Sequence, residues 1–125
     1  MAGKLLGRTV LVVEDEPLIA IDVAATLELE GAKVISANML KDALAKCDAP
    51  GLSAVILDHK LNQDDTSAVC EKLEKFRIPF IIYSGYTELG GACGRAELVP
   101  KPASPHALVV ALLDALTKGD RLSIH

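Results

Sequence analysis

The chain has 125 residues, half of them hydrophobic, and a formal net charge of −4. This length and composition are typical of one folded domain with its own core. The acidic balance and the presence of only two Tyr and two Phe argue against a nucleic-acid-binding protein, which needs basic patches and stacking aromatics.

The N-terminal apolar run and the cysteines indicate the compartment. The run from Val10 to Val13 is too short for a signal-peptide core or a membrane span, so we expect a cytoplasmic protein. Cys47, Cys70 and Cys93 are widely spaced, and no CxxC pair occurs. We therefore expect each cysteine to be a small hydrophobic residue in a reducing compartment.

Five apolar or β-branched segments alternate with helical segments. Strands are predicted at residues 9–13, 32–37, 53–58, 80–84 and 96–99. Helices are predicted at residues 17–30, 39–47, 66–76 and 105–119. Three glycines weaken residues 87–95, where we expect a short helix or none, and residues 61–65 are predicted as a loop. The alternation predicts an α/β fold of the (βα)5 type, with a doubly wound, five-stranded parallel sheet.

Single residues mark the expected helix ends. Pro17 suits a first helical turn, and Asn38 and Ser104 suit N-caps. Gly31 and Gly119 suit helix C-termini. The side chains predicted to face the core are Leu18, Ile21, Ala25 and Leu29 on the first helix, Val69, Leu73 and Phe76 on the third, and Leu108, Leu112, Leu113 and Leu116 on the last.

Polar residues follow four of the predicted strands at their carboxyl ends, which meet at one edge of a parallel sheet. They are Glu14 and Asp15, then Asp58, Ser84 and Lys101. Three neighbouring carboxylates raise one another's pKa and need a shared cation, and oxygen ligands without His or Cys point to a hard ion such as Mg²⁺. A carboxylate nucleophile, a hard metal, an ammonium group and a hydroxyl together predict a site for a phosphoryl group.

The motifs VLVVEDEP, VILD, IIYSGY and VPKP lie at these strand ends in this order. With them, the chain resembles a response-regulator receiver domain of bacterial two-component signalling over essentially its whole length. IIYSGY is also loosely similar to the motif of the single-domain subset named for Phe-Ala-Thr-Gly-Tyr. The resemblance implies a flavodoxin-like sheet with strand order 2-1-3-4-5, and one receiver domain over residues 1–125 with its core at about 8–119.

The resemblance also implies a role for each residue of the site. Asp58 would be the phosphoacceptor. Ser84 would hydrogen-bond a phosphoryl oxygen, and Lys101 would neutralise its charge. In this family the Lys–Pro bond, here Lys101–Pro102, is commonly cis.

The metal site is implied in the same way. Mg²⁺, with Mn²⁺ as a substitute, would be held by Asp15 and Asp58 directly, and by Glu14 through water. The backbone carbonyl of Lys60 would be a further ligand.

The implied function is that of a phosphorylatable switch. A phosphohistidine on a histidine kinase or a histidine phosphotransfer protein would donate its phosphoryl group to Asp58. Phosphorylation would change a surface formed by the last helix, the last strand and the weak fourth segment. This surface would then bind a downstream protein effector or a second copy of the chain. The resemblance implies catalysis of the domain's own phosphorylation and dephosphorylation only, with no direct binding to nucleic acid or membrane.

Two features depart from the common pattern of receivers. Leu98 stands where many receivers carry the aromatic switch residue, and Asn62 stands where a Pro is usual. We therefore expect the switch to involve Ser84, Leu98 and Tyr86, with residues 84–95 becoming ordered on phosphorylation.

Two other functions use the same residues. A phosphohydrolase with an aspartyl intermediate typically has a second acid two residues after its nucleophile, where this chain has Lys60. A non-phosphorylated interaction module on the same fold would not need the complete set of strand-end residues. Of the remaining polar residues, His59 is predicted to be an exposed loop residue, His106 a surface residue, and Asp64 and Asp65 loop and helix-cap residues.

Overall fold

The computed structural model describes residues 3–61, 64–85 and 91–123. The strands of its main sheet are β1 (Thr9–Val13), β2 (Lys33–Ala37), β3 (Leu52–Leu57), β6 (Phe80–Ser84) and β7 (Glu97–Pro100). They are all parallel and lie in the order β2-β1-β3-β6-β7. This order confirms the predicted doubly wound sheet, with its five strands taken as 2-1-3-4-5.

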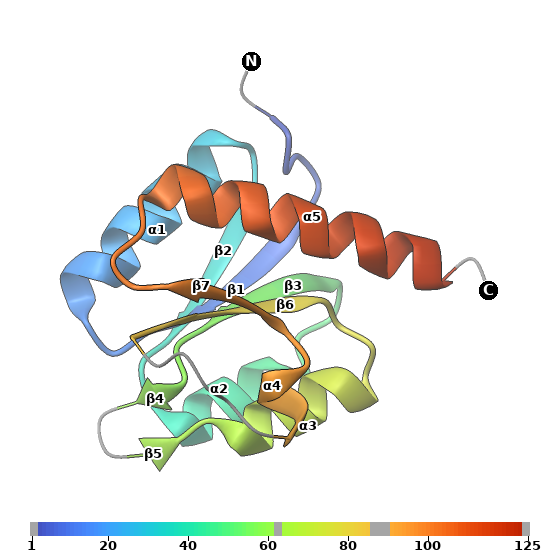
Figure 1. The fold of residues 1–125 in the computed structure, drawn as a ribbon. Helices are drawn as coiled ribbons and strands as arrows, with labels where there is room; N and C mark the ends of the chain where they lie inside the picture. The colour runs from blue at the N-terminus through green and yellow to red at the C-terminus, as the bar shows by residue number, and fades with distance from the viewer. Residues whose placement is uncertain (1–2, 62–63, 86–90, 124–125) are drawn as a thin grey trace.

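Helices cover both faces of the sheet. They are α1 (Pro17–Leu29), α2 (Leu40–Lys46), α3 (Ser67–Lys75), α4 (Gly91–Gly94) and α5 (Pro105–Ser123). Figure 1 shows α1 and α5 on one face and α2, α3 and α4 on the other. None of the helices in the described part of the chain is long and apolar enough to cross a membrane.

Alternate side chains of the central strands pack into two separate hydrophobic cores, one on each face of the sheet. Val10 and Val12 of β1 point toward α1 and α5, and belong to a cluster that we call the α1/α5 core. Leu11 and Val13 of the same strand belong to the opposite cluster, the α2/α3/α4 core. This alternation is the period of two of a β-strand, and it explains why β1 and β3 are apolar along their whole length.

The exposed face of α1 contradicts the prediction for this helix. Leu18, Ile21 and Leu29 are 76%, 63% and 74% exposed, whereas Val23 and Leu27 are buried in the α1/α5 core. Because α1 is apolar on nearly all sides, its pattern allowed more than one inner face, and the contact with β1 and α5 selects the one with Val23 and Leu27. Ala25 is likewise exposed.

The predictions for the other two helix faces were mostly correct. Val69 and Leu73 of α3 and Leu108, Leu112 and Leu116 of α5 are buried, and Leu113 is partly buried. Phe76, predicted to face the core, is 46% exposed because it lies at the C-cap, beyond the last residue of α3.

Helix ends agree with the sequence in part. Gly31 follows the C-cap of α1, Glu30, and has a φ of +94°, as predicted for a glycine that ends a helix. The Ser104 Oγ accepts a hydrogen bond from the Ala107 amide at 3.1 Å, as predicted for an N-cap. Asn38 is not the N-cap of α2, since Met39 occupies that position. Gly119 does not end α5: a Cβ there would lie 2.6 Å from Cγ of Pro79, so this glycine allows close packing of α5 instead.

A short antiparallel pair replaces the loop predicted at residues 61–65. It consists of β4 (Lys60–Leu61) and β5 (Asp64–Asp65). Burial of Leu61 in the α2/α3/α4 core draws this polar segment onto the domain. Asn62, which replaces the usual Pro, lies outside the described residues.

The weak fourth segment contains a single helical turn, α4, which confirms the prediction of a short helix. Cys93 of α4 is joined to Cys70 of α3 by a disulfide. The prediction that each cysteine is a separate small hydrophobic residue was therefore wrong for these two, because the fold brings two residues distant in sequence into contact. Cys47 is a buried free thiol, as predicted.

Candidate functional site

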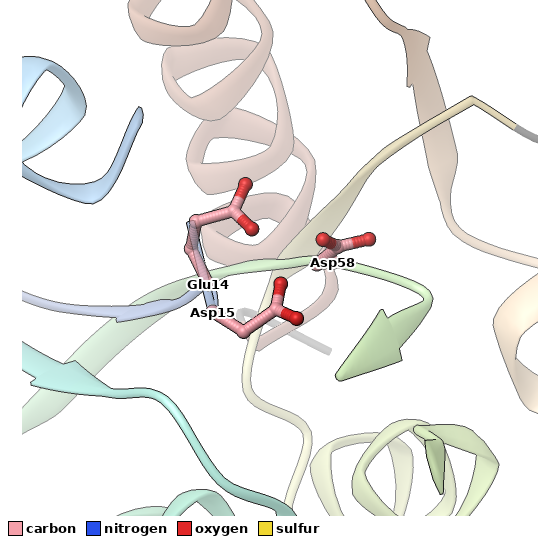
Figure 2. A group of neighbouring side chains, drawn as sticks. All are labelled: Glu14, Asp15 and Asp58. Carbon is pink, nitrogen blue, oxygen red and sulfur yellow. The ribbon is translucent and has the colours of Figure 1, made fainter. Parts of the chain in front are cut away.

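Three carboxylates meet at the carboxyl ends of β1 and β3. Glu14 and Asp15 follow β1, and Asp58 follows β3. Each offers an oxygen, and these oxygens all lie within 4.8 Å of one another (Figure 2).

Backbone pairing holds these residues in place beyond the strand ends. The Asp58 amide donates to the Val13 carbonyl and the Glu14 amide donates to the Ala37 carbonyl, both at 3.0 Å. The positions of the carboxylates therefore follow directly from the register of β1 with its two neighbours.

The Lys101 ammonium lies between two of the carboxylates. Its Nζ is 3.0 Å from Oδ2 of Asp58 and 3.1 Å from Oε1 of Glu14. The Lys101 amide donates to the Ser84 carbonyl at 2.9 Å, and the Lys101–Pro102 peptide bond is cis, as the resemblance implied. These contacts bring residues from the first, third and last strands of the main sheet to one point.

The charges of the cluster do not balance. Burial, followed by the hydrogen bond and the negative charge of Asp58, raises the pKa of Glu14 to about 7, although Lys101 opposes the rise. Burial by itself lowers the pKa of Lys101, but Asp58 and Glu14 outweigh this effect and raise that pKa overall. A single ammonium thus leaves excess negative charge, and the oxygen-only donor set fits a hard divalent cation.

Ser84 brings a hydroxyl to the same edge. It ends β6, which pairs with β3, and its side chain is buried. An oxygen nucleophile, oxygens that can bind a cation, an ammonium group and a hydroxyl therefore lie together, and this set can bind and accept a phosphoryl group.

The other predicted residues are more scattered. Leu98 is half-buried on β7 and packs against the α2/α3/α4 core. Lys60 lies in β4, two residues after Asp58, and the position of its carbonyl as a metal ligand stays a prediction. Tyr86 lies outside the described residues.

Three of the less central predictions can be compared with the structure. His106 is exposed, as expected. Asp64 and Asp65, predicted as loop and helix-cap residues, form β5 instead. Asp65 Oδ1 accepts the Ser67 amide at 2.6 Å, but Thr66 occupies the N-cap of α3. His59 is half-buried rather than exposed, because its carbonyl is held by hydrogen bonds from Thr66.

Two supporting residues were missed in the sequence. The Tyr83 hydroxyl donates to the Ala103 carbonyl at 3.2 Å and accepts from the Ala103 amide at 3.3 Å, and Lys101 Nζ lies 5.1 Å from the centre of the Tyr83 ring. Thr66 is fully buried, and its hydroxyl donates toward the carbonyls of Asp58 and His59 at 2.9 and 2.7 Å. In the sequence, Tyr83 could have been identified as a hydroxyl-bearing residue within the otherwise apolar residues 80–83 of β6.

Two curated proteins are related to this chain. The alkaline phosphatase synthesis transcriptional regulatory protein PhoP of Bacillus subtilis (strain 168) is 30% identical over 118 residues, which covers 86% of this chain and 49% of PhoP. The phyllosphere-induced regulator PhyR of Methylorubrum extorquens is also 30% identical over 118 residues, which covers 89% of this chain and 44% of PhyR. The chain thus spans about half the length of these curated relatives.

Solved structures share the fold. The response regulator receiver domain protein (CheY-like) from Methanospirillum hungatei JF-1 aligns with a TM-score of 0.80 at 24% identity, covering 91% of this chain and 97% of that one. The response regulator receiver protein from Sinorhizobium medicae WSM419 aligns with a TM-score of 0.80 at 21% identity, covering 90% and 97%.

The sequence profile of the response regulator receiver domain matches residues 10–113, which include all the strands of the main sheet except the first residue of β1. The chain therefore belongs to the response regulator receiver domain family, the phosphorylatable switches of two-component signalling.

Proposed function

We propose that Asp58 accepts a phosphoryl group from a phosphohistidine of a partner protein, and that this changes the protein-binding surface of the domain. The contact of Lys101 Nζ with Oδ2 of Asp58, inside the three-carboxylate cluster, carries the proposal. An ammonium group at this position would neutralise the negative charge that the equatorial oxygens of a transferred phosphoryl group gain.

Each residue has a distinct part in the transfer. An Asp58 carboxylate oxygen attacks phosphorus, the nitrogen–phosphorus bond of the donor histidine breaks, and the aspartyl phosphate retains the phosphoryl charge. Lys101 pairs with that charge, and the Ser84 hydroxyl donates a hydrogen bond to a phosphoryl oxygen. Burial of Asp58 and Ser84 limits the access of water, which strengthens both interactions.

A divalent cation belongs to this proposal. Asp15 and Asp58 would bind Mg²⁺ directly, Glu14 through a water and Lys60 through its carbonyl, and Mn²⁺ would substitute. The bound ion supplies positive charge beside the phosphoryl oxygens. The support is the oxygen-only donor set, together with the raised pKa of Glu14, to which burial contributes most and the neighbouring Asp58 carboxylate adds.

The switch would act only on itself. We infer that residues 8–119 form the signalling unit, that it catalyses its own phosphorylation and dephosphorylation, and that it turns over no external metabolite. The residues proposed to change conformation on phosphorylation are Ser84, Leu98 and Tyr86. A downstream protein is proposed to bind the changed surface.

The exposed side of α1 is the proposed docking surface for the phosphodonor, a histidine kinase or histidine phosphotransfer protein. Leu18 and Ile21 begin this side only a few residues after Asp15, so a partner that covers them also reaches the acidic edge. Burial of a leucine or isoleucine contributes about 1.5–3 kcal/mol. Ile21→Asp should therefore slow transfer from a protein donor while leaving phosphorylation by acetyl phosphate unchanged.

Phosphotransfer to wild type and to Asp58→Asn tests the proposed function. Wild type should gain a base-labile phosphoryl group in the presence of Mg²⁺, from acetyl phosphate or a phosphorylated histidine phosphotransfer protein. Asp58→Asn should gain none while keeping its circular dichroism spectrum. Equal labelling of both proteins would refute the assignment, and labelling of neither would favour a non-phosphorylated interaction module.

A further inference from the structure

The disulfide between Cys70 and Cys93 joins α3 to the one-turn helix α4. Their Cα atoms are 5.2 Å apart, and both side chains are buried in the α2/α3/α4 core. Twenty-three positions separate the two cysteines in sequence, so the bond restrains a long connection that includes β6 and Ser84.

Contacts lead from this disulfide to the phosphoacceptor. The Thr66 carbonyl accepts the Cys70 amide at 3.2 Å and lies 4.0 Å from Sγ of Cys93. The hydroxyl of the same threonine holds the Asp58 carbonyl at 2.9 Å. Thr66 is therefore in contact with both cysteines and with the backbone of the acceptor residue.

The two cysteines are anchored very differently. Cys70 lies in the nine-residue helix α3, whereas Cys93 lies in α4, which has an exposed glycine at each end. A single helical turn bounded by glycines opens at little cost, because it has few hydrogen bonds to lose. Without the disulfide, α4 would be held by its packing and by the exposed ion pair between Arg95, the residue after α4, and Glu74 of α3. An exposed ion pair of this kind contributes little to stability, because solvent screens its charges.

We propose that Cys70 and Cys93 are a reversible redox pair, and that the disulfide fastens α4 to α3 and weakens occupation of the Asp58 site by a phosphoryl group. The second half of this inference rests on the proposed function. The disulfide restricts the positions that α4 can take relative to α3, and a ligand whose binding requires α4 to move then binds less tightly.

The redox step is a thiol–disulfide exchange with a small-molecule disulfide such as oxidised glutathione. When α4 opens, the Cys93 thiolate attacks one sulfur of glutathione disulfide, forming a mixed disulfide and releasing one glutathione thiolate. The Cys70 thiolate then displaces the second glutathione from Cys93. Two protein thiols are oxidised, one glutathione disulfide is reduced to two thiols, and these take up the two protons.

Cys47 provides an internal control. It is buried in the same core, and burial raises the pKa of its thiol, which lowers the fraction of reactive thiolate. Cys47→Ala should therefore leave the redox equilibrium of the pair unchanged.

The experiment equilibrates the whole chain in glutathione buffers of graded ratio, with and without Mg²⁺ and beryllofluoride as the phosphoryl analogue. Free thiols are blocked after an acid quench and counted by intact-mass spectrometry. Beryllofluoride should shift the equilibrium toward the dithiol by about fivefold or more, and, by reciprocity, should bind the reduced protein more tightly by the same factor. The Cys47→Ala variant should show the same shift.

Two results would overturn the inference. If Cys70 and Cys93 stay as thiols in excess oxidised glutathione, the redox pair does not exist. If the pair oxidises but beryllofluoride binds both forms equally, or binds the oxidised form more tightly, the proposed coupling is wrong while the proposed function stands. Absence of beryllofluoride binding in either form would instead count against the proposed function, and with it the coupling.

Discussion

The carboxylate side of the site and its response side are built in different ways. On the carboxylate side, Glu14, Asp15 and Asp58 extend two adjacent strands whose backbone pairing continues past their ends. On the response side, which we define as β6, α4 and β7, Ser84 is followed by a single helical turn tied to α3 by a disulfide. The strand ends thus fix the carboxylate oxygens. The one-turn helix has few hydrogen bonds of its own, and the disulfide is its main restraint.

Lys101 is the link between the two sides. It follows β7, yet its ammonium contacts the carboxylates of Asp58 and Glu14. Lys101→Ala should lower the rate of phosphorylation by acetyl phosphate by about 10²–10³-fold at saturating Mg²⁺, the usual cost of removing one electrostatic stabiliser.

Lys118→Ala is the matched control for this substitution. Lys118 is an exposed lysine paired with Asp114 on α5, away from the site. Time courses of label incorporation should show a normal rate for this variant. A Lys101→Ala rate within twofold of wild type would contradict the assigned role.

The stability of the two sides should differ as well. Leu57, the last residue of β3, is fully buried, and Leu98 on β7 is half-buried. Leu57→Ala should lower the free energy of unfolding by about 2–5 kcal/mol through the cavity it leaves. Leu98→Ala should cost about 1 kcal/mol. Urea unfolding titrations would measure both losses, provided that the variants keep the wild-type dependence of the unfolding free energy on urea concentration. Equal losses would show that the two sides do not differ in stability.

The carboxylate side was largely predictable from the sequence. Unbroken apolar runs identify β1 and β3, and the residues that follow such strands in a parallel sheet must share one edge. The sequence therefore predicts that Glu14, Asp15 and Asp58 lie together, and the same reasoning adds Lys101, which follows the last strand.

The response side and the helix faces depend on contacts between distant residues. The Cys70–Cys93 bond and the close approach of Gly119 to Pro79 each join segments that no local pattern connects. On α1, apolar residues surround the helix, so periodicity alone could not select the face that carries Leu27. The disulfide, the approach of Gly119 to Pro79 and the inner face of α1 are therefore all determined by tertiary packing.

The proton on Glu14 is a further test of the carboxylate side. Because its pKa rises from 4.5 to about 7 on folding, the folded chain holds a proton that the unfolded chain releases between these values. Glu14 should therefore contribute stability that is present below about pH 4.5 and lost as the pH rises through about 7.

Magnesium should reverse this loss, since a cation offsets the carboxylate charge. The rise in melting temperature on adding Mg²⁺ should be larger at about pH 8 than at about pH 6. Scanning calorimetry of wild type and Glu14→Gln would measure the difference. A rise in wild type that does not depend on pH would show that Glu14 does not titrate in this range.

Tyr83 should give the smallest effect, since it acts on the site only by positioning Lys101. Tyr83→Phe removes the hydrogen bonds to Ala103 but keeps the ring beside the ammonium. We expect a loss of about 1 kcal/mol in stability, and a fall in phosphorylation rate of at most about fivefold. Tyr83→Leu, which also removes the ring, should be slower still, and equal rates for the two variants would show that the ring has no part in positioning Lys101.

The central claim, that Asp58 is the residue phosphorylated, is tested most directly by chemical mapping. Wild type is incubated with acetyl phosphate and Mg²⁺, reduced with borohydride, which converts aspartyl phosphate to homoserine, and digested for peptide sequencing by mass spectrometry. We predict homoserine at position 58 and unchanged aspartate at position 15. Homoserine at another position, or none in a protein that has gained phosphate, would contradict the claim.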